Sequence, residues 1–299
     1  MATIYTQIDK NTRRTWLMMG LFFILIILIG WVFSQVYGNP VILYGAVIFS
    51  IAMNFASYWY SDKLVLAISR AKPIEKKDAP ELYRIVENLT ITAGLPMPKI
   101  YILEERALNA FATGRDAKHA VVAVTRGLLE RLDKNELEGV LAHELSHIGN
   151  RDMLVSTVAV VLVGFIAMLS DFFLRFTFFS SHRRDNEGKG GNVLMLIGVA
   201  LAILAPLIAS LMRLAISRRR EFLADASGVL LTRYPEGLIN ALKKISSDPA
   251  QLSVANHATA HLFIANPFKA RDGVDFLTKI FMTHPPIKER IQALERVKF

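Results

Sequence analysis

The chain has 299 residues, 53% of them hydrophobic, a net charge of +9 and no cysteine. This hydrophobic content is high for a soluble protein, so composition points to a membrane protein. Without cysteine, disulfides are excluded, and any metal must be bound by nitrogen and oxygen ligands. The lysines and arginines gather beside apolar segments, which is the positive-inside pattern of membrane proteins, and we therefore expect no nucleic-acid partner.

Four apolar segments approach the roughly 20 residues that a helix needs to cross a bilayer. They run over 16–33, 41–60, 153–173 and 193–212. One such segment alone also suits a buried core helix, but four with almost no charge predict a mainly α integral membrane protein with four transmembrane helices. No small-x-small cleavage site follows the first segment, so we interpret it as a retained anchor.

The loop between the first two segments, 34–40, is short and uncharged, whereas Lys10, Arg13 and Arg14 precede them and further basic residues follow residue 60. The positive-inside rule therefore places both ends of this hairpin in the cytoplasm. The arginines at 218–220 agree with this orientation. Basic residues in the loop between the third and fourth segments count against it.

This topology divides the chain into four parts. Transmembrane hairpins are expected over 1–60 and 153–217, and cytoplasmic parts over 61–152 and 218–299. Both termini are then cytoplasmic.

Residues 61–142 read as a small α/β unit. Segments 99–105 and 120–124 are rich in β-branched residues and predict short strands, with "NAFATG" at 109–114 as an edge strand between them. Residues 78–95 have helical apolar spacing, with Asp78 as the expected N-cap and Pro80 in the first turn.

A second helix is predicted where Asp133 is followed three residues later by Glu136, the spacing of a capping box. It carries "HELSH" at 143–147. His143 and His147 are four residues apart, so both can point at one metal ion. Glu144 lies where its carboxylate can accept a proton from the attacking water. For the motif alone, an ordinary amphipathic helix with satisfied polar residues stays the alternative.

A catalytic zinc ion takes three protein ligands and keeps a fourth position open. His147 and Glu221 each lie about 8–9 Å from an apolar segment if both helices continue straight out of the bilayer. This common height favours Glu221 as the third ligand and excludes His182, which lies at the other end of the hairpin. Asp225, one turn later, is expected to orient a ligand histidine. For "EFLAD" alone, a solvated helix start is the alternative.

Three further residues have open interpretations. Asp152 is expected either to brace a zinc histidine or to hold the helix at the membrane surface. Asn109 and Ala110 either bond the backbone of an extended substrate that adds to the edge strand, or form a turn between structural strands.

Together the motifs resemble the HtpX family of membrane zinc metalloproteases. They are "HELSH" with "GNRDM" and an apolar segment after it, "SRRREFLADA", "NAFATG" and "THPPIKERI". The resemblance covers nearly the whole chain. It implies a cytoplasmic α+β gluzincin-type protease domain with a small sheet, at the bacterial inner membrane. It also implies one Zn²⁺ per chain on His143, His147 and Glu221, and quality control of damaged or misfolded membrane proteins.

The related CaaX prenyl endopeptidases suggest two more residues. His284, and Arg290 six residues later, would donate to the oxyanion of the tetrahedral intermediate. The alternative is that "THPP" only starts the last helix.

We therefore expect a zinc endopeptidase whose partners are membrane-protein substrates and the lipid bilayer; the oligomeric state stays open. A processing peptidase of the prenyl-protease type would keep this chemistry and change the substrate. A transporter would need polar residues along its spans, which here hold few. A scaffold with a structural zinc site would not need Glu144 and would have a fourth protein ligand.

Overall fold

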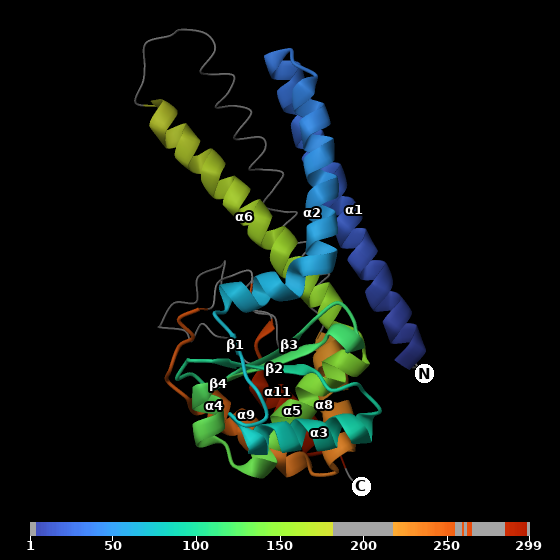
Figure 1. The fold of residues 1–299 in the computed structure, drawn as a ribbon, viewed down its shortest axis with the longest axis vertical. Helices are drawn as coiled ribbons and strands as arrows, with labels where there is room; N and C mark the ends of the chain where they lie inside the picture. The colour runs from blue at the N-terminus through green and yellow to red at the C-terminus, as the bar shows by residue number, and fades with distance from the viewer. Residues whose placement is uncertain (1–3, 182–217, 255–258, 260–261, 265–284, 298–299) are drawn as a thin grey trace.

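The computed structural model describes residues 4–181, 218–254, 259, 262–264 and 285–297. Three long helices stand on a unit made of a small sheet and shorter helices (Figure 1). They are α1 (Ile4–Tyr37), α2 (Val41–Ile68) and α6 (Met153–Ser181). The fourth predicted span, 193–212, and His182 lie outside the described residues.

Two helices in the described part of the chain are long and apolar enough to cross a bilayer, Asp9–Gln35 within α1 and Val41–Ile68. The start of α6, Met153–Ile166, meets this test only together with α5 (Lys134–Gly149). The structure thus supports the first predicted hairpin. A third span is present only if the bent pair of α5 and α6 is a single broken span. The second helix continues to Ile68 instead of ending at residue 60.

The sheet has four strands in the order β1-β2-β4-β3. They are β1 (Lys72–Pro73), β2 (Lys99–Leu103), β3 (Ala110–Thr113) and β4 (Val121–Thr125). β2 and β4 are parallel, and the other two pairs are antiparallel. β3 is an edge strand, as the sequence predicts.

Both faces of the sheet are covered. Alternate side chains of a strand point to opposite faces, and each set packs into a different core. Val122 and Val124 pack into the larger core with α3 (Pro80–Ala93) and α5. Val121 and Phe111 face the other way and join a second core with the end of α2. The sheet therefore connects the membrane helices to the helical layer on its far side (Figure 1).

The described residues form five further short helical elements, of which α8 and α9 pack directly against α5. They are the 3₁₀ turn η1 (Ala117–His119), α4 (Arg126–Arg131), α8 (Arg218–Thr232), α9 (Pro235–Ser247) and α11 (Ile287–Leu294). Two glycines let backbones meet: Gly228 of α8 lies against the backbone of His143, and Gly139 of α5 lies against that of Leu238 in α9. α5 is thereby held in the middle of the protein.

Local sequence signals gave one correct cap and one misplaced cap. Asp133 and Glu136 form the predicted capping box at the start of α5. The N-cap of α3, however, is Ala79, and the carboxylate of Asp78 accepts a hydrogen bond from the backbone N–H of Glu75 at 2.8 Å. Pro80 lies in the first turn of α3, as predicted, and the helix starts one residue later than an Asp78 cap would place it.

The prediction that the helix of "HELSH" continues straight into the third apolar segment is wrong. The helix is interrupted between α5 and α6, and the axes of the two helices are bent by 84° relative to each other. Arg151 adopts a left-handed backbone conformation at the break, with φ of 52°. The helix α5, which carries the metal motif, and the apolar helix α6 therefore meet at a sharp corner and do not form one continuous helix.

Candidate metal centre

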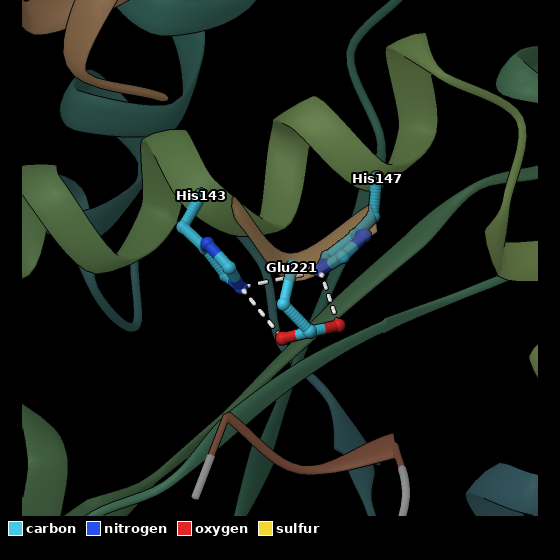
Figure 2. A group of neighbouring side chains, drawn as sticks. All are labelled: His143, His147 and Glu221. Carbon is cyan, nitrogen blue, oxygen red and sulfur yellow. Dashed lines mark hydrogen bonds and ion pairs between the residues drawn. The ribbon is translucent and has the colours of Figure 1, made fainter. Parts of the chain in front are cut away.

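One face of α5 presents two histidines to a glutamate of α8 (Figure 2). The Nε2 atoms of His143 and His147 lie 3.1 Å apart. One carboxylate oxygen of Glu221 lies 3.8 Å from the first Nε2, and the other oxygen lies 3.8 Å from the second. Four-coordinate zinc with bonds near 2 Å keeps its ligand atoms roughly 3.3 Å apart, so the spacing and the donor types fit this metal. Among the described residues, these three form the group that could hold a metal ion.

Each histidine is oriented through its other ring nitrogen. The Nδ1 of His143 lies 2.9 Å from the carboxylate of Asp225, and the Nδ1 of His147 lies 3.0 Å from that of Asp152. Both Nε2 atoms are thereby directed at Glu221. Carboxylates in this position fix the tautomer and raise the basicity of a metal-binding imidazole.

The corner between α5 and α6 positions Asp152. This residue directly follows Arg151, and its backbone N–H donates to the carbonyl of His147 at 3.3 Å. The neighbouring carbonyl of Asn150 accepts from the side chain of Asn11, a buried residue of α1, at 3.3 Å. A helix that continued straight would carry Asp152 away from His147, since residues five apart do not share a face.

Arg290 of α11 lies behind the candidate ligands. Its side chain is completely buried and bonds the carboxylate of Asp225 at 2.6 and 2.9 Å, and the carbonyl of Ile264 at 3.0 Å. Burial acts to raise the pKa of Asp225, but the charge of Arg290, with the hydrogen bonds of Arg290 and His143, lowers it to about 2. Asp225 is therefore ionised, and Arg290 holds it against His143.

The two histidines have opposite tendencies to take up a proton. Burial, with the nearby charge of Arg290, lowers the pKa of His143. For His147, burial also favours the neutral ring, but the carboxylates of Asp152, Glu221 and Glu144 outweigh it and raise the pKa to about 10. A metal ion at Nε2 of His147 therefore competes with a proton.

Glu144 is 2% exposed and lines the same small cavity as the candidate ligands. Burial raises the pKa of its carboxyl group to about 7, against the charge of His147 and a hydrogen bond from the backbone of Ala112. A carboxyl group with a pKa near neutrality can both accept and release a proton at physiological pH.

The cavity has a volume of about 30 Å³, and Ala112, Leu262 and Ile264 contribute to its lining. This is room for about one water molecule. The backbone N–H of Ile264 donates to the carbonyl of Ala110 at 3.1 Å, so residues 262–264 lie along the outer edge of β3. The motifs in the sequence do not indicate this position of residues 262–264, because it depends on a pairing between distant parts of the chain.

The structure brings together seven of the residues selected from sequence: His143, Glu144, His147, Asp152, Glu221, Asp225 and Arg290. Asn109 and Ala110 border this group. The backbone of Asn109 exchanges hydrogen bonds with Thr125, and the carbonyl of Ala110 is bonded to Ile264. Their role towards a substrate stays a prediction. His284 lies outside the described residues. Sequence reasoning missed Ala112, although it follows Ala110 by two residues and so lies on the same face of the predicted strand.

Comparison with known proteins gives consistent matches. Residues 76–298 match Peptidase family M48. A "Protease HtpX homolog" of Thermoanaerobacter pseudethanolicus is 44% identical, with 98% of this chain and 97% of the relative covered. One of Pyrococcus furiosus is 45% identical, with 95% of each covered. The crystal structure of S. mikatae Ste24p has a TM-score of 0.51 at 20% identity and covers 99% of this chain and 67% of that one, which supports the fold alone.

Proposed function

Because this chain belongs to peptidase family M48, together with the HtpX relatives it matches over nearly its full length, it is a membrane metalloprotease, and we propose that it uses zinc to cut misfolded or damaged membrane proteins at the cytoplasmic surface. One observation carries the proposal. His143 and His147 each have Nδ1 on a carboxylate and Nε2 directed at Glu221.

In this proposal one Zn²⁺ is held by the Nε2 atoms of His143 and His147 and by the carboxylate of Glu221. When bound, zinc supplies a Lewis acid that polarises the scissile carbonyl and makes a water molecule a stronger acid. Nitrogen and carboxylate donors without sulfur are a normal ligand set for a catalytic zinc.

Glu144 has the position and the acidity of the general base. Its carboxylate takes a proton from the attacking water, and the same carboxyl group later gives this proton to the nitrogen of the leaving amine. The pKa near 7 supports both transfers. Its burial keeps bulk water from competing for the proton.

The resemblance to the CaaX prenyl endopeptidases suggests Arg290 as an oxyanion donor, but its contacts support a different role. Both of its bonds to Asp225, and the contact of its Nη2 with Nδ1 of His143 at 3.4 Å, lie on the side of the histidine away from Glu221. We assign it a positioning role. His284 remains our proposed oxyanion donor.

The substrate is proposed to approach along the edge of β3 at Asn109 and Ala110, where the carbonyl of Ala110 becomes available once Ile264 leaves it. The cavity of about 30 Å³ is too small for a peptide, so residues 262–264 must move aside on binding. We propose that 61–152 and 218–299 form the cytoplasmic protease, and 1–60 and 153–217 the two membrane hairpins. The corner between α5 and α6 supports a position of the site next to the bilayer.

The test uses the purified full chain in detergent, loaded with zinc, and a membrane-protein substrate. Glu144→Gln should lose cleavage and keep one zinc per chain, because Glu144 is assigned to the proton and not to the metal. Glu138→Gln, a carboxylate on the same helix that does not line the cavity, is the matched control and should cleave normally. Cleavage by Glu144→Gln at the wild-type rate would refute the assignment. A chelator should abolish cleavage by the wild type. A prenyl-type processing peptidase would cut a short C-terminal peptide instead of the membrane protein.

A further inference from the structure

A second and larger cavity lies away from the metal centre, where the last turns of α2 meet β2, β4 and η1. Its volume is about 720 Å³. Figure 1 shows that these turns of α2 bend across the end of the sheet unit that faces the long helices. The cavity is therefore built from the end of a candidate membrane span and from the protease unit together.

The charged lining of this cavity is mostly positive. Lys63, Lys99, Arg115 and Lys118 line it, against one carboxylate, that of Asp62. These cations come from α2, β2 and the β3–β4 connection, so the fold gathers them from distant parts of the sequence. A concave surface of one sign favours an anionic ligand.

Two of the cations are arranged on aromatic rings. The guanidinium of Arg115 lies 4.7 Å from the ring centre of Trp59, and Nζ of Lys63 lies 5.2 Å from that of Tyr60. The Nη2 of Arg115 also contacts Nε2 of His119 at 2.6 Å. The Asp116 carboxylate lies 2.7 Å from Nδ1 of His119 and 3.5 Å from Nε of Arg115. These contacts fix the direction of the arginine before any ligand binds.

The apolar part of the lining indicates which anion fits. Phe55 and Trp59 of α2 line the cavity and are 57% and 43% exposed. Only 11% of the span window in α2 is buried inside the protein, which leaves the rest of this helix for lipid. Tryptophan and tyrosine at the end of a span are typical of the interface between hydrocarbon and water.

We propose that this cavity binds the headgroup of an anionic phospholipid. The phosphate would contact Arg115 and Lys118, and the acyl chains would run along the exposed apolar face of α2 next to Phe55. A free phosphate would leave the apolar wall unused, whereas basic pockets beside membrane helices suit lipid headgroups. The lipid would bridge α2 and the sheet, and so fix the protease unit against the membrane surface.

The fluorescence of Trp59 serves as the reporter of lipid binding in the test. The full chain has three tryptophans, so Trp16→Phe and Trp31→Phe leave Trp59 as the single one. Lipids with brominated acyl chains are titrated into the protein in neutral detergent, and quenching of Trp59 is measured. Phosphatidylglycerol should quench at a concentration at least tenfold lower than phosphatidylcholine. Equal quenching by the two lipids would overturn the proposal.

Removing the positive charges of the cavity tests whether these residues bind the lipid headgroup. Arg115→Gln with Lys118→Gln should weaken phosphatidylglycerol binding by roughly 10- to 30-fold, because each cation near an anionic lipid surface contributes about one factor of five. The matched control is Lys134→Gln with Lys243→Gln, two exposed lysines outside the cavity, and should change binding less than twofold.

Unchanged binding in the first pair, or an equal loss in the control pair, would contradict the assignment. If the first pair does not fold, Lys63→Gln with Lys99→Gln carries the same test. Millimolar inorganic phosphate should leave lipid binding intact. If phosphate abolishes it, the cavity is a site for the free ion and the lipid proposal fails.

Discussion

Gly228 controls how closely α8 approaches α5 at the candidate metal centre. A Cβ atom at this position would lie 2.9 Å from the backbone nitrogen of His143, and 3.1 Å from its Cα and from the carbonyl carbon of Ala142. Ordinary contacts begin near 3.4 Å. All three atoms belong to the backbone of a central helix, so they cannot turn away. Gly228→Ala must therefore separate the two helices by about 0.5 Å, the difference between 3.4 and 2.9 Å.

The effect on stability should be small. Alanine is about 1 kcal/mol more favourable than glycine inside a helix, whereas overpacking costs about 1–3 kcal/mol. The net loss in the free energy of unfolding is then between zero and about 2 kcal/mol, and the protein folds. The effect on the site should be larger, because Glu221 and Asp225 move with α8 while His143 and His147 stay on α5. Since a 1 Å misplacement can reduce activity about 100-fold, half of it should reduce kcat/KM about 10-fold.

The assay is zinc affinity by competition with a chelator, together with proteolysis by the zinc-loaded enzyme in detergent. Gly149→Ala is the matched control, because Gly149 lies on α5, the helix that Gly228 packs against, and its Cβ would meet only the Cδ1 of Leu95 at 3.9 Å. Zinc affinity and kcat/KM should both fall for Gly228→Ala and stay normal for Gly149→Ala. Wild-type values for Gly228→Ala would refute the claim that this contact sets the ligand geometry.

Two further predictions concern buried charges. Arg290→Met removes the cation from the buried carboxylate of Asp225 and should lower the free energy of unfolding by about 3–5 kcal/mol, measured by denaturant titration in detergent; a wild-type value would show that the pair contributes nothing. Asp248 accepts from the backbone of Leu108 and from Arg131, and these bonds hold its pKa below the usual range although burial opposes them. The stability from Asp248 is complete above about pH 4 and is lost as pH falls through the lowered pKa, so Asp248→Asn should flatten the acid limb of the stability curve. An unchanged acid-unfolding midpoint would count against it.

Signals within one turn or one strand predicted much of this fold. The capping box at Asp133 placed the start of α5 correctly, and the spacing of His143 and His147 put both rings on one face. The short strand β3 was also predicted from its own residues. These features depend on neighbours within four residues, where helix and strand geometry is nearly fixed.

Features that depend on distant contacts were not predictable in this way. Nothing in "GNRDM" requires the left-handed conformation of Arg151, since glycine and not arginine is the usual residue there. The corner becomes understandable once Asn11 of α1 is seen to bond Asn150, and once Asp152 is seen to reach His147. Likewise, the positioning role of the Arg290 side chain becomes clear only when Asp225 is known to lie beside it.

The position of Arg290 in the chain also bears on how the protein is made. It lies 147 residues after His143 and 65 residues after Asp225, yet it contacts both. A ribosome therefore completes the helix of "HELSH", and the helix α8 that supplies Glu221 and Asp225, before α11 exists. During that interval the carboxylate of Asp225 lacks the cation that holds it against His143. The candidate centre is thus completed only after the four apolar segments and all three candidate ligands have been made.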